Sequence, residues 1–401
     1  MISLKNVCIG LLFLIFYGMN QLDAQELKSI KGKILEKEYR IPIPYVTVRL
    51  LNNNKNTISN SEGSFNLDIS TATIKDTVLF TSIGYKPLKI TVEFIQKGSV
   101  SEFLMTGNRI TLEEVTINPI LVTSILNKAV KTSNARYASP LILKGYYREL
   151  VKRDSIISKY ADGLVEYYIE RTKKNEPRIS LKVNESRVKE LPIPDDEDKF
   201  NGFNTHLDLT AMAEFISPIK ASVLDSTYFK YYNYSLSEIT DNGRDVYSID
   251  FKPVIGEKEA FYEGRLYIDK QTLLIMSVDY KVAPASVKYL KSVSLFGMTI
   301  GLISKSMVLR YKLTDNQYYL SYISRSHGMK ISSKKLNQQN EFKSEFVVTD
   351  AQVDNCIPFP KNITYTKRSL YKRGNKYTFD FWNNYNISPN TLEEIKFIEK
   401  N

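Results

Sequence analysis

The 401-residue chain is predicted to be mainly β, and two observations carry that prediction. Aromatic residues make up 12% of the chain, with 27 tyrosines and 19 phenylalanines, and such residues are enriched in strands. Short segments with alternating apolar and polar residues recur between Gly, Asn and Asp turn signals. The length suits two domains. We therefore expect an N-terminal seven-stranded β-sandwich followed by a larger antiparallel β domain, with few helices.

The first 24 residues predict a secretory signal peptide. Lys5 precedes an apolar run, Val7 to Met19, and the small-residue stretch ending at Ala24 follows it, which is the usual arrangement of an export signal. The run is too short to span a bilayer, so we expect cleavage after Ala24 and export to the periplasm or to the outer membrane. The exported chain would keep one cysteine, Cys356, and could form no intramolecular disulfide.

Residues 26–105 predict the sandwich. After Pro44, residues 45–50 alternate with period two, and Phe65, Leu67 and Ile69 alternate again after a tight turn. Gly63 and Gly84 lie at breaks between strands, where a positive φ or a close backbone approach favours glycine.

This region also resembles a known family, the carboxypeptidase-regulatory-like domain, through four blocks in order: Lys31–Ile34, Ile43–Val48, Asn60–Leu67 and Ser82–Lys86. The resemblance implies a transthyretin-like sandwich of the kind found at the N-termini of Bacteroidetes envelope proteins. It implies an accessory domain without catalysis, despite the family name. Ile110–Ile117 resembles the segment that joins this domain to the next one in outer-membrane receptors, and the rest of the chain resembles uncharacterised proteins that carry the domain.

A connector with a helix is expected over residues 106–139, because apolar residues recur there at helical spacing: Leu121, Ile125, Leu126, Ala129 and Val130.

Residues 140–401 predict a long antiparallel meander. A hairpin is expected over 143–168, and further strands are expected over 228–239, 245–251, 260–268, 273–282, 307–313, 318–324, 343–348 and 376–381. The polar stretch 171–200, with the acidic run Asp195–Asp198, predicts a long loop, and 207–216 predicts a short helix. The apolar stretch 293–303 predicts a buried strand or helix. The hairpin 261–280 is similar to lipoprotein-carrier half-barrels, so a half-barrel is one arrangement of this domain.

The formal net charge of +11 does not predict nucleic-acid binding. Its densest patch is Lys367, Arg368, Lys372, Arg373 and Lys376, interleaved with Tyr371 and Tyr377. Basic residues with aromatic neighbours can bind single strands, but the export signal and the lack of a nucleic-acid motif favour a solvated face near an anionic envelope surface.

Composition leaves little room for common catalytic chemistry. The two histidines, His206 and His327, have no glutamate three residues later, so a zinc peptidase site is not expected. Gly-x-Ser-x-Gly and phosphate-binding glycine motifs are absent from the sequence. We therefore predict no catalytic, metal-binding or cofactor-binding residue.

Paired carboxylates are the exception, because a glycosidase needs only two. Six lie in or beside predicted strands: Asp162, Glu166, Asp245, Asp250, Glu263 and Asp269. Adjacent tyrosines such as Tyr146–Tyr147 and Tyr167–Tyr168 should place one ring in the core and one outside, because successive side chains on a strand point to opposite faces.

The sequence predicts a non-catalytic, exported envelope protein that binds a partner or ligand, apolar or glycan, through its C-terminal β domain. One alternative is a half-barrel carrier of a lipid or acyl chain, with a concave face lined by Leu, Ile, Val and Phe. The other is a glycan hydrolase with two carboxylates about 5–9 Å apart.

Overall fold

The computed structural model describes residues 29–52, 55–98, 101–108, 119–172, 177–190, 209–214, 222–241, 243–295, 297–314, 317–334, 336–372 and 388–399. The predicted signal peptide, the segment 110–117, the acidic run 195–198, His206 and the predicted strand 376–381 lie outside these residues. In the described part of the chain, no helix is long and apolar enough to cross a membrane.

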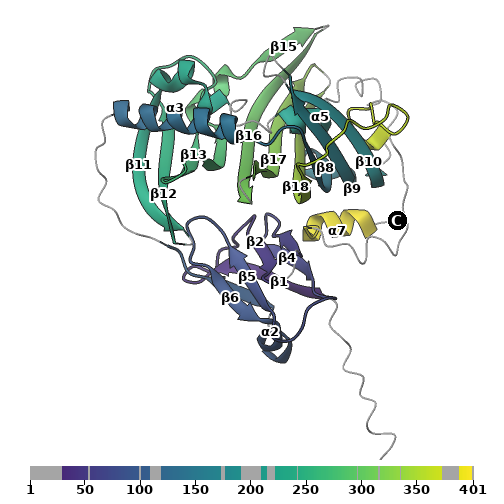
Figure 1. The fold of residues 1–401 in the computed structure, drawn as a ribbon. Helices are drawn as coiled ribbons and strands as arrows, with labels where there is room; N and C mark the ends of the chain where they lie inside the picture. The colour runs from purple at the N-terminus through teal and green to yellow at the C-terminus, as the bar shows by residue number, and fades with distance from the viewer. Residues whose placement is uncertain are drawn as a thin grey trace, which may run out of the picture.

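The N-terminal region is the predicted seven-stranded sandwich (Figure 1). One sheet has the order β4-β1-β7 and the other β3-β2-β5-β6. The strands are β1 (Ser29–Glu36), β2 (Thr47–Leu50), β3 (Asn56–Ile58), β4 (Ser64–Asp68), β5 (Thr77–Thr81), β6 (Leu88–Thr91) and β7 (Glu102–Met105). Three phenylalanine rings, Phe65, Phe80 and Phe103, pack with centroids 4.8–5.4 Å apart in its core. The sandwich therefore has a hydrophobic core of its own.

Two local features of the sandwich follow from the backbone. Gly63 and Gly84 have φ of +75° and +87°, and a Cβ at Gly63 would lie 2.5 Å from the Ile34 carbonyl oxygen, so both predictions about these glycines are confirmed. A short helix that the sequence analysis did not predict, α2 (Val92–Gly98), follows β6. Its two buried residues, Val92 and Ile95, are three apart and pack on the sandwich core.

The second region is one open antiparallel sheet. Among the described residues it has eleven strands in the order β10-β9-β8-β18-β17-β16-β14-β13-β12-β11, with β15 paired to β16. The strands are β8 (Leu141–Arg153), β9 (Ile156–Arg171), β10 (Pro177–Glu190), β11 (Tyr232–Asp241), β12 (Arg244–Pro253), β13 (Tyr262–Asp269), β14 (Ile275–Val282), β15 (Ser292–Leu295), β16 (Met298–Thr314), β17 (Gln317–Ser332) and β18 (Asn337–Gln352). β10 and β11 lie at the two ends of the order, so the sheet does not close into a barrel.

The helices of this region are α3 (Pro119–Arg136), α5 (Leu209–Glu214) and α7 (Leu392–Glu399), with 3-10 turns η3 (Ser222–Leu224), η4 (Ser226–Tyr231), η5 (Pro284–Tyr289) and η6 (Leu370–Lys372). α3 and α5 were predicted. α7 was not, although Thr391 and Glu394 form a capping box: the Thr391 amide donates to Glu394 and the Glu394 amide to Thr391 Oγ1. A Thr-x-x-Glu sequence is a helix-start signal, so α7 could have been found.

Two predictions about this sheet were wrong. The expected loop over 171–200 contains the fourteen-residue strand β10. β10 is an edge strand with many charged residues, and because one edge faces water it needs few apolar side chains. The stretch 293–303 is not a buried strand as a whole either: it forms the hairpin of β15 and β16, in which all four residues of β15 are exposed although Met298 is buried.

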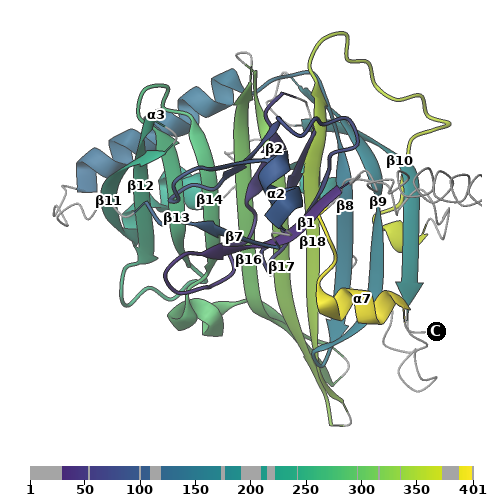
Figure 2. The ribbon, with the colours of Figure 1, turned by 90° about the horizontal axis from the view of Figure 1, so that it is seen from below.

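Both faces of the large sheet are covered. The helix face packs against α3, α5 and the 3-10 turns, and its core includes Val122, Leu126, Tyr147, Tyr167 and Leu309. On the opposite side, the sandwich face, the N-terminal domain lies across the central strands and α7 crosses β8 to β10 (Figure 2).

The prediction that each adjacent tyrosine pair has one ring in the core and one outside was wrong. Tyr146 and Tyr147 are both fully buried, and Tyr167 and Tyr168 are 1% and 3% exposed, because both faces of the sheet are covered.

Candidate ligand groove between the two domains

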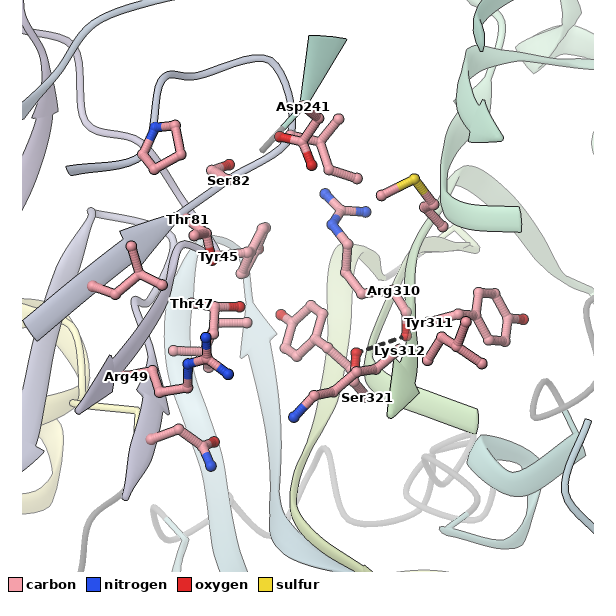
Figure 3. Close-up of a pocket in the computed structure, with 18 of the residues that line it drawn as sticks. Tyr45, Thr47, Arg49, Thr81, Ser82, Asp241, Arg310, Tyr311, Lys312 and Ser321 are labelled. Atoms are coloured by element: carbon pink, nitrogen blue, oxygen red, sulfur yellow. Dashed lines mark hydrogen bonds between the residues drawn. The ribbon is translucent and has the colours of Figure 1, made fainter. Parts of the chain in front are cut away.

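A groove with a cavity volume of about 950 Å³ lies between the sandwich and the large sheet (Figure 3). Its sandwich wall comes from β2, β5 and β6 and includes Tyr45, Thr47, Arg49, Thr81 and Lys89. The opposite wall comes from the sandwich face of β16 and β17 and from nearby turns, and includes Asp241, Arg310, Lys312, Tyr319 and Ser321. Pockets of this size hold small-molecule ligands.

The period of β2 supplies the sandwich wall. Val46, Val48 and Leu50 are fully buried in the sandwich core. The residues between them, Thr47 and Arg49, are exposed and line the groove. Strand alternation therefore separates the core of the domain from its ligand-facing surface.

Two contacts hold the two walls together, and a third joins the sandwich to the segment before α7. The rings of Tyr45 and Tyr322 lie 5.0 Å apart, within a small apolar cluster that also includes Ile58 and Val347. The Asn108 side-chain amide donates to the carbonyl oxygen of Thr240. On another side, Asn60 Nδ2 donates to the Pro389 carbonyl oxygen at 3.1 Å, which joins the sandwich to the segment preceding α7.

The lining of the groove is positively charged. It contains six cationic side chains, namely Arg49, Lys86, Lys89, Arg244, Arg310 and Lys312, and three carboxylates, namely Asp241, Asp269 and Asp350.

Each of the three carboxylates has a partner. Asp269 accepts bonds from the Thr272 amide and hydroxyl, Asp350 pairs with Lys144 at 3.2 Å, and Asp241 lies 3.8 Å from Arg244. The groove therefore offers more cationic than anionic groups to a ligand.

The cations differ in how they are held. Arg310, 24% exposed, binds both carboxylate oxygens of Asp279. Burial alone would lower the pKa of its guanidinium, but Asp279 more than offsets this and raises it. Arg49 and Lys89 are exposed, and within the described part of the chain no ion pair involves either of them. They are the groups best placed to receive an anionic ligand.

Hydroxyl groups complete the lining. Thr47, Thr81, Ser82 and Ser321 all contribute to it, and Ser321 Oγ donates to the Arg310 carbonyl oxygen at 3.1 Å. Hydroxyl, guanidinium and ammonium groups around one space suit a polar, negatively charged ligand.

The residues considered for catalysis are not brought together here. His327 lies on the helix face, stacked on Phe342 with ring centroids 4.9 Å apart. Burial, followed by the charges of Arg325 and Lys305, lowers the pKa of this imidazole to about 4. Cys356 is a free thiol in a loop, with a pKa raised mainly by burial. Within the described residues, no group of three or more His, Cys, Asp or Glu could hold a metal ion.

The strand carboxylates have structural partners. Asp162 binds Arg187, Glu166 lies 3.2 Å from Lys182, and Asp250 binds Arg265 at 2.6 Å. Glu263 lies 3.5 Å from Lys281, and Asp245 contacts Thr240 at 3.4 Å. Only Asp269 lines the groove, where it stabilises a turn.

Sequence reasoning missed a cluster of buried charges beneath α7. Arg148, 4% exposed, lies 3.0 Å from Glu394 of α7 and 3.3 Å from Glu345 of β18. Its Nε donates to the Tyr146 hydroxyl at 3.1 Å, and that hydroxyl donates to Asp162 at 2.9 Å. The signal in the sequence was the alternation of Tyr146, Arg148 and Leu150, which places Arg148 on a face with two apolar neighbours.

Two protein families match separate parts of the chain. Residues 30–117 match the family described as the CarboxypepD_reg-like domain, and residues 162–311 match a family of unknown function, DUF5686. No curated protein matches the chain.

Solved structures with some similarity include a DUF1329 family protein from Desulfovibrio piger, with 13% identity over 60% of this chain and 95% of that one and a TM-score of 0.24. A LolA superfamily protein from Nitrosomonas europaea has 8% identity over 60% and 97%, with a TM-score of 0.21. The MucA/MucB complex of Pseudomonas aeruginosa has 12% identity over 58% and 99%, also with a TM-score of 0.21. At these scores the similarities carry no argument about function.

Proposed function

We propose that this protein is an exported, non-catalytic binding protein of the cell envelope, and that its ligand occupies the groove between the sandwich and the large sheet. One observation carries the proposal: the groove is large enough for a ligand, and two of its cations, Arg49 and Lys89, form no ion pair within the described residues. The sandwich acts as a docking module and also supplies one wall of the site. We infer a ligand that is polar and anionic, such as a carboxylated or phosphorylated sugar.

A lipid or acyl carrier has less support from the geometry. A carrier would use the helix face, which has the expected lining of apolar side chains. That face already packs against α3, whose Val122, Leu126 and Ala129 are fully buried against it. An acyl chain would have to displace the helix.

A two-carboxylate hydrolase has less support still. The strand carboxylates that sequence analysis considered are engaged by Arg187, Lys182, Arg265 and Lys281.

Calorimetric titration tests the proposal. The exported form, residues 25–401, is titrated with uronic-acid oligosaccharides and phosphorylated sugars at low salt, and neutral oligosaccharides of the same length serve as the ligand control. We expect binding of an anionic member, at least about thirtyfold weaker in the double variant R49A/K89A, because each of the two lost contacts to a charged group costs about 1 kcal/mol or more.

The matched control is K31A/K75A, which removes two exposed lysines elsewhere on the sandwich and should leave binding unchanged. Equal affinities for R49A/K89A and the wild-type protein would place the ligand outside the groove. Preference for the neutral oligosaccharides would contradict the anionic ligand.

A further inference from the structure

The β15–β16 hairpin extends beyond the rest of the large sheet (Figure 1). Its register pairs Val293 with Ile300 and Leu295 with Met298. Gly297 at the turn has φ of +75°, and nothing lies within 4 Å of the position its Cβ would occupy. The tip therefore extends away from the body of the protein.

The hairpin has one apolar and one polar face. Residues directly opposite each other in a ladder share a face, so Val293, Leu295, Met298 and Ile300 lie together, with Ile331 of β17 beside Ile300. On the other face, Ser294 and Thr299 form a hydrogen bond at 2.9 Å. Met298 is only 8% exposed, but Val293 and Leu295 are 65% and 46% exposed, which is unusual for large apolar side chains on a projecting edge strand.

Lysines surround the base of this hairpin. Lys291 directly precedes β15, Lys288 lies in η5 before it, Lys330 pairs with Gly301 across the ladder, and Lys334 follows β17. Within the described part of the chain, none of these four lysines is in an ion pair with a carboxylate.

Acidic residues are scarce in this part of the sequence. Residues 280–314 and 316–340 contain no Asp or Glu. Two carboxylates are near in the register: Glu341 of β18, which lies opposite Gly328 and accepts a hydrogen bond from Ser326 at 3.5 Å, and Asp154, in the turn between β8 and β9. Its Oδ1 accepts the Gln339 amide at 2.9 Å, and the cationic Arg153 precedes it. The end of the sheet that carries the hairpin is therefore strongly cationic.

We propose that this hairpin is a membrane-docking element, in which the apolar tip enters the surface of an anionic bilayer while the four lysines bind lipid headgroups. The charge of the lysines selects an anionic surface. β15 spans four residues, about 13 Å, which is long enough to reach the depth of about 5–10 Å at which peripheral elements lie in the interface. This inference is independent of the ligand groove and uses none of its residues.

Vesicle co-sedimentation tests the proposal with residues 25–401. The probes are vesicles of phosphatidylglycerol and phosphatidylcholine in a 3:7 ratio, compared with pure phosphatidylcholine, in 0.1 M salt. We expect the protein to sediment with the anionic vesicles only. We expect V293S/L295S to lower the partition coefficient at least about tenfold, and K288A/K291A/K330A/K334A to lower it by a similar or larger factor, since each lysine contributes about fivefold.

Two control variants match these changes. I255S alters a 97% exposed isoleucine in the turn between β12 and β13, and K128A/K131A removes two exposed lysines of α3. Both should sediment as the wild-type protein does, and the thermal unfolding of every variant should remain cooperative.

Failure to sediment with anionic vesicles would overturn the proposal, as would sedimentation that the tip and lysine variants leave unchanged. If a purified envelope protein instead bound the wild-type chain and lost affinity for V293S/L295S, with no vesicle binding, the hairpin would be a protein interface and the membrane proposal would be wrong.

Discussion

Arg148 and Glu149 are adjacent on β8 and point to opposite faces of the large sheet, and the two faces accommodate a buried charge in different ways. Arg148 lies on the sandwich face between the carboxylates of Glu345 and Glu394. Glu149 lies on the helix face and accepts hydrogen bonds from the hydroxyls of Tyr147 and Ser369 and from the Leu370 amide. One charge is paired with opposite charges, while the other has neutral donors.

The consequence is a difference in protonation. Burial raises the pKa of Glu149 to about 7, even though its hydrogen bonds oppose the shift. The carboxylates beside Arg148 instead raise the pKa of its guanidinium, which stays charged. Both groups are buried, yet one face holds a permanent charge and the other a titratable group, because the covering segments differ. α7 supplies a glutamate to Arg148, whereas Ser369 and the start of η6 supply a hydroxyl and a backbone amide to Glu149.

The largest expected effect comes from breaking the charged cluster on the sandwich face. R148M should lower the free energy of unfolding by about 3–5 kcal/mol, because Glu345 and Glu394 would be left buried without a counter-charge. Urea unfolding followed by circular dichroism measures it. R265A is the matched control, since its pair with Asp250 is about half exposed and should cost less than about 1 kcal/mol. Equal losses would show that burial does not distinguish the two pairs.

The titratable group on the helix face should give a pH dependence. The pKa of Glu149 is about 7 in the folded state, above the ordinary value of 4.5 for a glutamate, so the folded protein binds an extra proton between these two pH values. Its contribution to stability is full below about pH 4.5 and is lost as the pH rises through 7, by about 3 kcal/mol in all.

E149Q lacks this titration. Urea unfolding from pH 4.5 to 8 measures both proteins. Over this range the wild-type protein should lose about 3 kcal/mol of unfolding free energy relative to E149Q. His327 contributes a slope of the opposite sign, because its pKa is lowered in the folded protein, but it is present in both proteins and cancels. Parallel stability curves would contradict the raised pKa of Glu149.

The smallest effect comes from the paired tyrosines. Y146F removes a hydroxyl that joins Arg148 to Asp162, two charged groups, and should cost about 2 kcal/mol. Y147F removes a donor to Glu149, which is protonated at pH 5, and should cost about 1 kcal/mol there. Chemical unfolding at pH 5 compares the two. A larger loss of unfolding free energy for Y147F than for Y146F would contradict the expectation that hydrogen bonds to charged groups on the sandwich face contribute more.

Local patterns predicted much of the fold. The sandwich follows from alternation and from Gly63 and Gly84, where the backbone requires φ values that favour glycine. α3 follows from apolar residues at helical spacing, and most strands of the large sheet follow from period-two segments. β10 escaped prediction because an edge strand needs few apolar residues, and the β15–β16 hairpin was placed in the core because apolar content alone does not show which face meets water.

The groove could not be predicted in the same way. Its walls are Thr47 and Arg49 on one domain and Arg310 and Ser321 on the other, and each is an ordinary outward-facing residue of its own strand. Their proximity depends on contacts between residues far apart in the sequence, such as Tyr45 with Tyr322 and Asn60 with Pro389. Only the docking of the two domains turns two solvent-facing surfaces into a site.

The sequence by itself determined the β-rich class, the sandwich and the helix after it, because strand and helix periods are local properties of the chain. Tertiary structure decided which faces of those strands are covered. Period two places Tyr146 and Tyr147 on opposite faces, yet it cannot state that both faces are buried. That follows from a second layer, built by the sandwich and α7 on one side and by α3 and η6 on the other, and the position of this layer sets the buried charges, the groove and the exposed hairpin.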